Sequence, residues 1–257
     1  MPGADRDTFA PIAPADHLVQ GDIGVRYTRR VQDPGASPRR GWFITVEGPD
    51  GAGKTTQAET LAGHLSELGL DVLLTREPGG TEVGDRIREI LLSAGGERAA
   101  TEPLTDAFLF NAARHQLVVD VLRPALDAGR TVVCARYADS TLAYQGYGAG
   151  VPLERLRILE HAATDGLVPD LTILLDLSVE AGLGRKGPDE ITRFEGLDLA
   201  FHRRVRDGFL ALAATSPERF VVIDAMRPPH EVATAVNAAA SRLVGSGEPK
   251  PVATRTT

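Results

Sequence analysis

The segment EGPDGAGKTT (residues 47–56) has residue types and a spacing that could hold the phosphates of a nucleotide. It fits the pattern G-x-x-x-x-G-K-[ST], in which glycines allow backbone N–H groups to converge on an anion. A helix that begins near Lys54 would aim its unsatisfied N–H groups and the positive end of its dipole at the same point. The Lys54 ammonium would then reach the β- and γ-phosphates, and the Thr55 hydroxyl would bind Mg²⁺. The alternative is a plain strand-to-helix turn.

The predicted donor-nucleotide site takes in the whole loop and the first helical residues. It consists of Gly48, Pro49, Asp50, Gly51, Ala52, Gly53, Lys54, Thr55 and Thr56. Thr55 is the predicted metal ligand of this set. Such a loop binds the donor but does not identify the group that accepts the phosphoryl.

Arginines and an aromatic residue suggest where a second substrate binds. Arg76 and Arg136 end apolar runs, and ligands of open α/β sheets gather at the carboxyl ends of strands. Their guanidinium forks could clamp a second phosphate, unless each forms a surface ion pair. Phe110 and Arg114 are four residues apart and share one helix face, so a ring and a forked donor would suit a flat pyrimidine. The alternatives are a core aromatic and a solvated charge.

The segment GLGRKGPDEITRFE (182–195) is broken by glycines and is basic and polar. We expect a mobile loop between helices, which is the usual build of a closing lid. Phosphoryl transfer needs positive charge at the transferring oxygens, and Arg185, Lys186 and Arg193 could supply it. The alternative is a solvated charged loop.

Short apolar runs must position these groups. They lie at 42–47, 71–76, 130–136, 171–177 and 219–225. Each run is apolar at nearly every interior position, which is typical of strands buried on both faces of a parallel sheet.

Helical stripes fill the gaps between these runs. One stripe comprises Leu61, Leu65 and Leu68, with Gly69 as its expected stop, and a second comprises Phe201, Val205, Phe209 and Leu212. Because strands alternate with helices, we predict an α/β fold with a five-stranded parallel sheet flanked by helices. Residues 1–40 and 245–257 lack a clear period and are predicted to be disordered tails around one domain at 41–244.

The amino-acid composition limits the kinds of molecule that the protein is expected to bind and the compartment in which it is expected to occur. The formal net charge is −7, which argues against binding to a nucleic-acid polymer or to an anionic membrane. Cys134 is the sole cysteine, which excludes an internal disulfide and indicates a reducing compartment. No apolar run approaches the ~20 residues that span a bilayer, and the N-terminus lacks the apolar segment of a signal peptide. We therefore expect a cytoplasmic protein.

Five segments together resemble the bacterial thymidylate kinases. They are FITVEGPDGAGKTTQ (43–57), TREPGGTEVGDRIREILL (75–92), FLFNAARHQ (108–116), RYADSTLAYQG (136–146) and TRFEGLDLAFHRRVRDGFLALA (192–213), in the order of the family. The resemblance implies a three-layer P-loop NTPase fold at 41–244. It also implies transfer of the γ-phosphoryl group of ATP to dTMP, which gives dTDP, with Mg²⁺ as cofactor. A homodimer is implied as well.

The resemblance assigns roles to the charged residues. Arg76, Arg88 and Arg136 match arginines near the acceptor phosphate. Family members that lack an arginine in the phosphate loop supply one from the lid, and this chain fits that subtype. Asp50 or Glu77 could orient the acceptor or its metal. The predicted catalytic set is therefore Asp50, Lys54, Arg136, Arg185 and Arg193.

Other residues match those that contact the base and the sugar of the acceptor nucleotide in the family. Phe110 matches a phenylalanine that stacks on thymine, and Arg114 matches an arginine that bonds its O4. Polar residues that line the base pocket are matched by Ser140, Thr141 and Gln145, and a tyrosine beside the sugar by Tyr144. An alternative for this segment is a helix start, because Asp139 or Ser140 would make a good N-cap.

The chain departs from the family pattern at three acidic positions, where it has Ala113, Ala135 and Thr192. Ala135 matters most, because P-loop NTPases hold Mg²⁺ near an acid at such a strand end. Asp50, Glu77 or Asp139 could take over that role, or the enzyme could be slow. Two further hypotheses stay open: a kinase for a modified pyrimidine nucleotide, and a catalytically silent nucleotide-binding protein.

Overall fold

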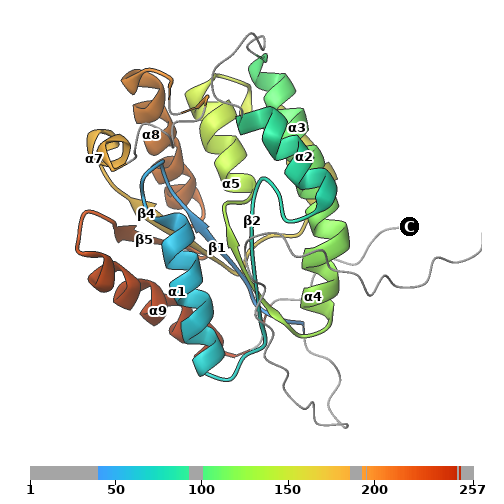
Figure 1. Cartoon of the computed structure of the whole chain (residues 1–257), viewed down its shortest axis with the longest axis vertical. Coiled ribbons are helices and arrows are strands. Elements are labelled where there is room, and N and C mark those ends of the chain that lie inside the picture. Colours follow the sequence, from blue (N-terminus) through green and yellow to red (C-terminus); the bar gives the residue numbers. More distant parts are fainter. Residues whose placement is uncertain (1–39, 93–100, 186–192, 195, 248, 250–257) are drawn as a thin grey trace, which may run out of the picture.

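Five parallel strands form the centre of the molecule (Figure 1). They are β1 (Phe43–Glu47), β2 (Val72–Arg76), β3 (Thr131–Ala135), β4 (Leu171–Asp176) and β5 (Phe220–Asp224), in the order β2-β3-β1-β4-β5. The computed structural model describes residues 40–92, 101–185, 193–194, 196–247 and 249. Each strand falls within one predicted apolar run, so the predicted five-stranded parallel sheet is confirmed.

Helices connect the strands and cover the sheet. They are α1 (Lys54–Glu67), α2 (Glu82–Leu92), α3 (Pro103–Leu117), α4 (Arg123–Asp127), α5 (Ala138–Thr141), α6 (Leu153–Thr164), α7 (Val179–Gly184), α8 (Leu199–Thr215) and α9 (Pro229–Gly245). Two π-helical segments, η1 (Val118–Leu122) and η2 (Leu142–Gly148), extend α3 and α5. In the described part of the chain, no helix has the length and apolar composition that a membrane span requires.

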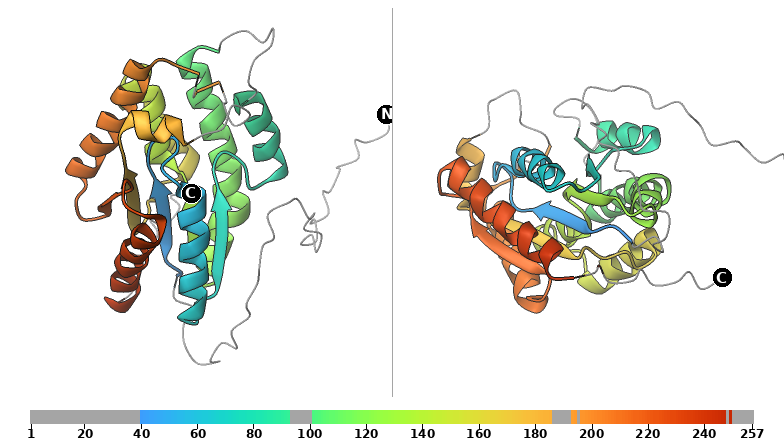
Figure 2. Two further views of the ribbon diagram at one scale, coloured as in Figure 1. Left: turned by 60° about the vertical axis from the view of Figure 1, so that its left-hand side comes forward. Right: turned by 90° about the horizontal axis from the view of Figure 1, so that it is seen from below.

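Alternate strand residues face two different cores, which gives the predicted three layers (Figure 2). Ile44 and Val46 of β1 pack with residues of α1 and α9 on one face. Phe43 of the same strand packs on the other face with Leu122 of η1 and Leu126 of α4. Because both faces are covered, the inner strands β1, β3 and β4 are buried at nearly every position, whereas the edge strands β2 and β5 are partly exposed.

The phosphate-loop helix ends one residue earlier than its leucine stripe suggests. Leu61 and Leu65 are fully buried, but Leu68 lies beyond the last helical residue and is 52% exposed. Gly69 does stop the helix, with a φ of +84° that favours glycine. The helical stripe predicted from the sequence is therefore one residue too long, because Leu68 is the C-cap of α1 and not part of the helix.

The tails lie outside the described residues except at their inner ends. Arg40, assigned to the first tail, contacts the domain through Asp170, with Nη1 2.7 Å from Oδ2. The helix α9 runs one residue past the predicted domain end, to Gly245. The disorder of both tails stays a prediction.

The predicted lid loop begins later than expected, because Gly182 and Gly184 belong to α7. Gly182 packs directly on the phosphate loop: a Cβ added there would lie 2.3 Å from the backbone oxygen of Asp50. This close approach fixes α7 against the loop. Lys186 and Thr192 lie outside the described residues.

We expect Gly182→Ala to lower the free energy of unfolding by about 1–3 kcal/mol, because the added methyl group overpacks a backbone contact. Gly184→Ala is the matched control in the same helix, since its Cβ would meet nothing within 4 Å. That control should keep or raise the unfolding midpoint. Thermal unfolding of both variants checks the expectation, and equal midpoints would contradict it.

Candidate active site

The phosphate loop joins β1 to α1 and takes the backbone path that its glycines permit. Gly51 and Gly53 have φ values of +74° and +83°, and Gly53 is the N-cap of α1. A side chain at position 51 would also collide with α7, because its Cβ would lie 1.9 Å from the oxygen of Gly182. Lys54 begins the helix and folds back over the loop, where its Nζ donates to the oxygen of Pro49 at 2.6 Å. The strand–loop–helix context that the motif requires is therefore present.

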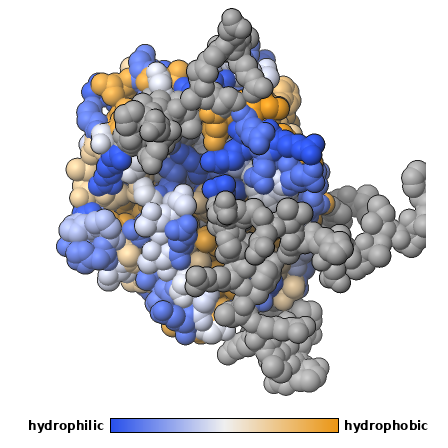
Figure 3. Space-filling view, in the orientation of Figure 1, coloured by the Kyte–Doolittle hydropathy of each residue, from blue (hydrophilic) through white to orange (hydrophobic). Residues whose placement is uncertain are grey.

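A cavity of about 570 Å³ opens beside this loop at the carboxyl ends of the strands. Strongly hydrophilic residues gather in the upper centre of the face seen in Figure 3. The predicted site residues that line the cavity are Asp50, Gly51, Gly53, Lys54, Thr55, Thr56, Arg76, Glu77, Arg88, Phe110, Arg136, Ser140, Thr141, Tyr144, Gln145 and Arg185. Its other lining residues are Pro78, Leu92, Ala135 and Phe194. Gly48, Pro49, Ala52, Arg114 and Arg193 are predicted site residues outside the lining.

Arg136 connects the acceptor side of the cavity to the phosphate loop. Its Nη2 lies 2.5 Å from Oδ1 of Asp50, and the Tyr144 hydroxyl donates to Oδ2 of the same carboxylate at 2.7 Å. The Arg136 guanidinium also lies over the Tyr144 ring. Burial alone would lower the pKa of Arg136, but Tyr144 and Asp50 outweigh it and raise that pKa, so the cation is permanent. Its φ of +69° turns the chain sharply after β3.

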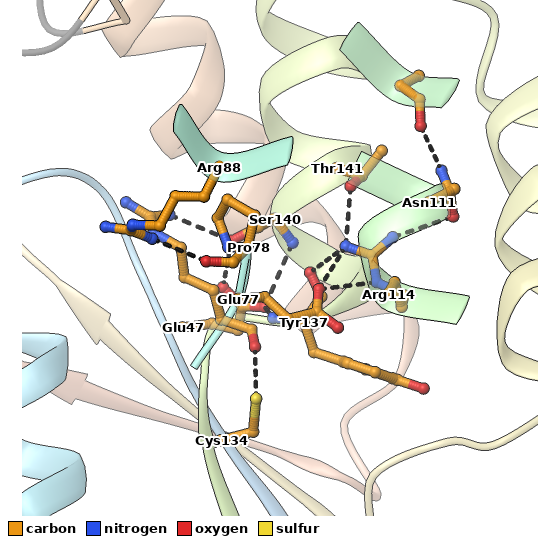
Figure 4. Close-up of polar contacts among 12 residues, drawn as sticks. Glu47, Glu77, Pro78, Arg88, Asn111, Arg114, Cys134, Tyr137, Ser140 and Thr141 are labelled. Carbon is orange, nitrogen blue, oxygen red and sulfur yellow. Dashed lines mark hydrogen bonds and ion pairs between the residues drawn. The ribbon is translucent and has the colours of Figure 1, made fainter. Parts of the chain in front are cut away.

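Arg76 and Arg88 present two further cations from the neighbouring elements. Arg88 of α2 donates to the oxygen of Pro78 at 2.9 Å (Figure 4). Arg76 ends β2 and pairs in register with Ala135 of β3. Within the described part of the chain, the Arg76 side chain makes no hydrogen bond or ion pair, although it lines the cavity. It is therefore available to an anion.

Arg114 lies behind the cavity wall, where it is 1% exposed. Its Nε donates to Oε2 of Glu77 at 2.9 Å, and its Nη2 donates to Oγ1 of Thr141 at 3.1 Å (Figure 4). Asn111 and the Tyr137 carbonyl accept further bonds from it. The structure thus brings Arg114 to Thr141, and a base-binding role for either residue stays a prediction.

Three aromatic residues that line the cavity, Phe110, Tyr144 and Phe194, lie close together. The ring centroid of Phe194 lies 5.9 Å from that of Phe110 and 6.2 Å from that of Tyr144. Arg193 lies over the Phe194 ring, but its Nη2 pairs with Asp106 of α3 at 2.8 Å. Phe194 was not predicted as a site residue, and its signal in the sequence was an aromatic residue in a mostly polar segment.

Arg185 occupies the donor side. Its Nη1 lies 3.3 Å from the oxygen of Gly51, and its Nη2 lies 3.0 Å from the oxygen of Ala225, just after β5. It is thus held against the phosphate loop, and its action on the donor nucleotide stays a prediction.

The residues around the loop fit a magnesium ion. Mg²⁺ takes most of its ligands from substrate phosphates and water, with one or two protein oxygens. The Thr55 hydroxyl and the carboxylates of Asp50 and Glu77 line the cavity. Oε1 of Glu77 is buried and has no hydrogen-bond partner in the described structure. No cluster of three or more His, Cys, Asp or Glu side chains that could hold a metal occurs among the described residues, as this coordination mode allows.

Asp139 does not join this group. Both of its oxygens pair with Arg219, at 2.7 and 2.8 Å, and it does not line the cavity. The N-cap interpretation of Asp139 or Ser140 was also wrong, because α5 begins at Ala138 and both residues lie inside it.

A parallel sheet with a glycine-rich phosphate loop after β1 and arginines at the ends of β2 and β3 defines a P-loop nucleotide kinase. A sequence model of the thymidylate kinase family matches residues 46–236. The chain is 52% identical to the thymidylate kinase of Thermomicrobium roseum, over 82% of this chain and 99% of the relative. It is also 52% identical to the Deinococcus radiodurans thymidylate kinase, over 79% and 97%.

A solved structure is similar as well. The crystal structure of thymidylate kinase from Ehrlichia chaffeensis matches with a TM-score of 0.62 and 33% identity, over 80% of this chain and 99% of that one. The chain therefore belongs to the thymidylate kinase family. The family and fold predicted from the motifs are confirmed.

We expect Arg76→Ala to weaken binding of a nucleoside monophosphate about ten- to hundredfold, the value of one charge-assisted hydrogen bond, while stability changes little. Arg114→Ala is the contrasting variant, because it leaves Glu77 buried without its cation and should cost about 3–5 kcal/mol of stability. Urea unfolding and dTMP titration of both variants check this. A large stability loss in Arg76→Ala, or none in Arg114→Ala, would refute the assignment.

Proposed function

We propose that the chain transfers the γ-phosphoryl group of ATP to dTMP, with Mg²⁺, and releases dTDP and ADP. The observation that supports this most directly is the placement of the phosphate loop and the acceptor arginines around one cavity. Family membership supports dTMP as the acceptor, and no comparison favours a modified pyrimidine or a silent protein.

The donor side of the reaction belongs to the loop, Lys54 and Arg185. The loop amides, the ammonium group and the guanidinium group surround the β- and γ-phosphates, where charge develops during transfer. The Thr55 hydroxyl would hold Mg²⁺, which when bound neutralises charge on these phosphates.

The acceptor side positions a second phosphate against the first. Arg76, Arg88 and Arg136 orient the 5′-phosphate of dTMP, and one of its oxygens attacks the γ-phosphorus. The bond from that phosphorus to the β–γ bridging oxygen breaks, and ADP leaves. No protein nucleophile takes part, because positioning and charge neutralisation carry this chemistry.

The base and sugar fill the remaining cavity. Phe110 stacks on the pyrimidine, and the ring of Tyr144 lies beside the sugar. The polar edge of the base meets Ser140, Thr141 and Gln145, with Arg114 behind them.

Two carboxylates are left to compensate for Ala135. Asp50 is engaged by Arg136 and Tyr144, whereas Glu77 keeps one oxygen without a partner in the described structure. Glu77 also follows Arg76 and donates its backbone N–H to the Ala135 oxygen at 2.9 Å. Glu77 therefore lies next to Ala135 and has a carboxylate oxygen that could take the role of the acid replaced by this alanine.

A coupled assay of ADP release tests the function with dTMP, dUMP, dCMP and dGMP as acceptors and Mg-ATP as donor. We expect turnover with dTMP of about 1–100 s⁻¹, which is the usual kinase range, and its loss with EDTA. Preference for dTMP over every other acceptor would remove the modified-pyrimidine hypothesis, whereas preference for another acceptor would contradict the assignment of dTMP. No turnover with any acceptor would support a silent nucleotide-binding protein.

A homodimer is the second part of the proposal, and the outer face of α3 supports it. Phe108, Ala112, His115 and Val119 recur every three or four residues on α3 and η1 and are all exposed. His115 contacts the backbone of α6, which adds the 63% exposed Ile158 to the same region. An apolar stripe of this kind suits burial against a second copy.

We expect Phe108→Arg to convert the dimer to a monomer, because it replaces the largest exposed apolar side chain of this stripe by a cation. Leu68→Arg is the matched control, since Leu68 is equally exposed, at 52% against 55% for Phe108, but follows α1 on the other face of the sheet. Light scattering after size exclusion measures the mass. A monomeric parent chain, or a dimer that Phe108→Arg leaves intact, would overturn this part of the proposal.

A further inference from the structure

Glu47, the last residue of β1, has a fully buried carboxylate that the catalytic scheme does not use. Its Oε1 accepts hydrogen bonds from the backbone N–H groups of Tyr137, at 2.7 Å, and Ser140, at 3.3 Å. Its Oε2 accepts from the Ser140 hydroxyl at 2.7 Å. Figure 4 shows Glu47 together with Tyr137 and Ser140.

These bonds supply a helix cap from a distant strand. The N-cap residue of α5, Tyr137, makes no capping hydrogen bond with its own side chain. The Glu47 carboxylate meets the N–H groups at this helix start instead, where a negative charge is favourable. Since α5 and η2 carry acceptor-site residues, the cap sets where those residues lie.

The same bonds close a ring between the two halves of the site. The Ser140 hydroxyl also accepts from Nη1 of Arg136 at 3.1 Å, and Arg136 pairs with Asp50. Asp50 lies three residues after Glu47 in the phosphate loop. The ring therefore runs from Glu47 through Ser140, Arg136 and Asp50 back to Glu47, and fixes the acceptor arginine relative to the donor loop.

We propose that Glu47 is a positioning residue for phosphoryl transfer: its ionised carboxylate holds Ser140 and, through it, Arg136 at the distance from the phosphate loop that the reaction needs. This inference rests on the proposed function. It adds a residue that touches neither nucleotide.

The surroundings of Glu47 make this arrangement depend on pH. Burial, helped by the negative charge of Asp139, raises the pKa of Glu47 to about 7, although Ser140, Arg136 and Tyr137 act to lower it. Arg219 and Cys134 are the other ionisable groups that sense its charge. A carboxyl protonated at Oε2 would donate to the Ser140 oxygen, so this bond would reverse and the Ser140 hydroxyl would lose the acceptor for its own proton. The intact ring therefore belongs to the ionised form and forms as pH rises through about 7.

Ionisation of Glu47 as pH rises has opposite effects on the stability of the fold and on the proposed activity. Because the folded pKa lies above the unfolded value of 4.5, the contribution of Glu47 to stability is full below that value and is lost as pH rises through about 7. A loss of activity below pH 7 would therefore not come from a loss of fold through this group.

The test compares Glu47→Gln with Glu160→Gln. Glu160 of α6 is a matched control, because burial raises its pKa to about 7 as well, yet it does not line the cavity. We expect Glu47→Gln to keep the unfolding midpoint at pH 8 but to lose about tenfold in kcat/KM for dTMP, with KM for ATP within twofold. Glutamine keeps the size of the side chain but presents an N–H donor to Ser140.

At each pH, kcat/KM of the wild type is divided by kcat/KM of the variant. The dTMP phosphate itself titrates near pH 6, and this ratio cancels its effect. The ratio of kcat/KM should rise between pH 6 and pH 8 for Glu47→Gln and stay flat for Glu160→Gln. A flat ratio near one for Glu47→Gln would overturn the proposal, and so would a loss that follows a lowered unfolding midpoint.

Calorimetric titration of dTMP at pH 6 and pH 8 gives the same comparison without turnover. If the wild type is inactive, the proposed kinase function fails, whereas the binding ratio still decides the role of Glu47. A full affinity in Glu47→Gln at both pH values would refute the positioning role alone.

Discussion

One ion pair, between Asp50 in the phosphate loop and Arg136 after β3, holds the two halves of the cavity together. The pair is short, at 2.5 Å, and the Tyr144 hydroxyl completes the coordination of the carboxylate. It is possible because β1 and β3 are neighbours in the sheet, so their carboxyl ends lie side by side. The left-handed backbone of Arg136 costs about 1–2 kcal/mol, and the surrounding hydrogen bonds offset that strain.

The chain is acidic as a whole and basic where phosphates would bind. The formal net charge of the sequence is −7, while the cavity gathers Arg76, Arg88, Arg136 and Arg185. All but Arg76 are already held by carbonyl or carboxylate oxygens in the described structure. Cations that are fixed before a substrate arrives need little reorganisation when charge develops on it.

Local patterns predicted the strands, the phosphate loop and the family, because each depends on neighbours in the sequence. The predictions that failed or were not made concern residues whose partners lie far away in the sequence. Asp139 was a candidate for the metal site, but it pairs with Arg219, which lies 80 residues later. Glu47 was not predicted to have a role, because its partner Ser140 lies 93 residues away. Leu68 was misjudged for the opposite reason, since periodicity does not show where a helix ends.

The buried pair of Glu77 and Arg114 restricts how this family member can evolve. Each charge lies within 2.8 Å of the other at 1–3% exposure, so losing one leaves its partner uncompensated in a medium that solvates it poorly. If only one of the two residues is substituted, the resulting variant is expected to fold poorly. Substitution of both residues together need not have this effect. The two sites are therefore expected to show strong epistasis and to covary among homologues, even though they lie 37 positions apart.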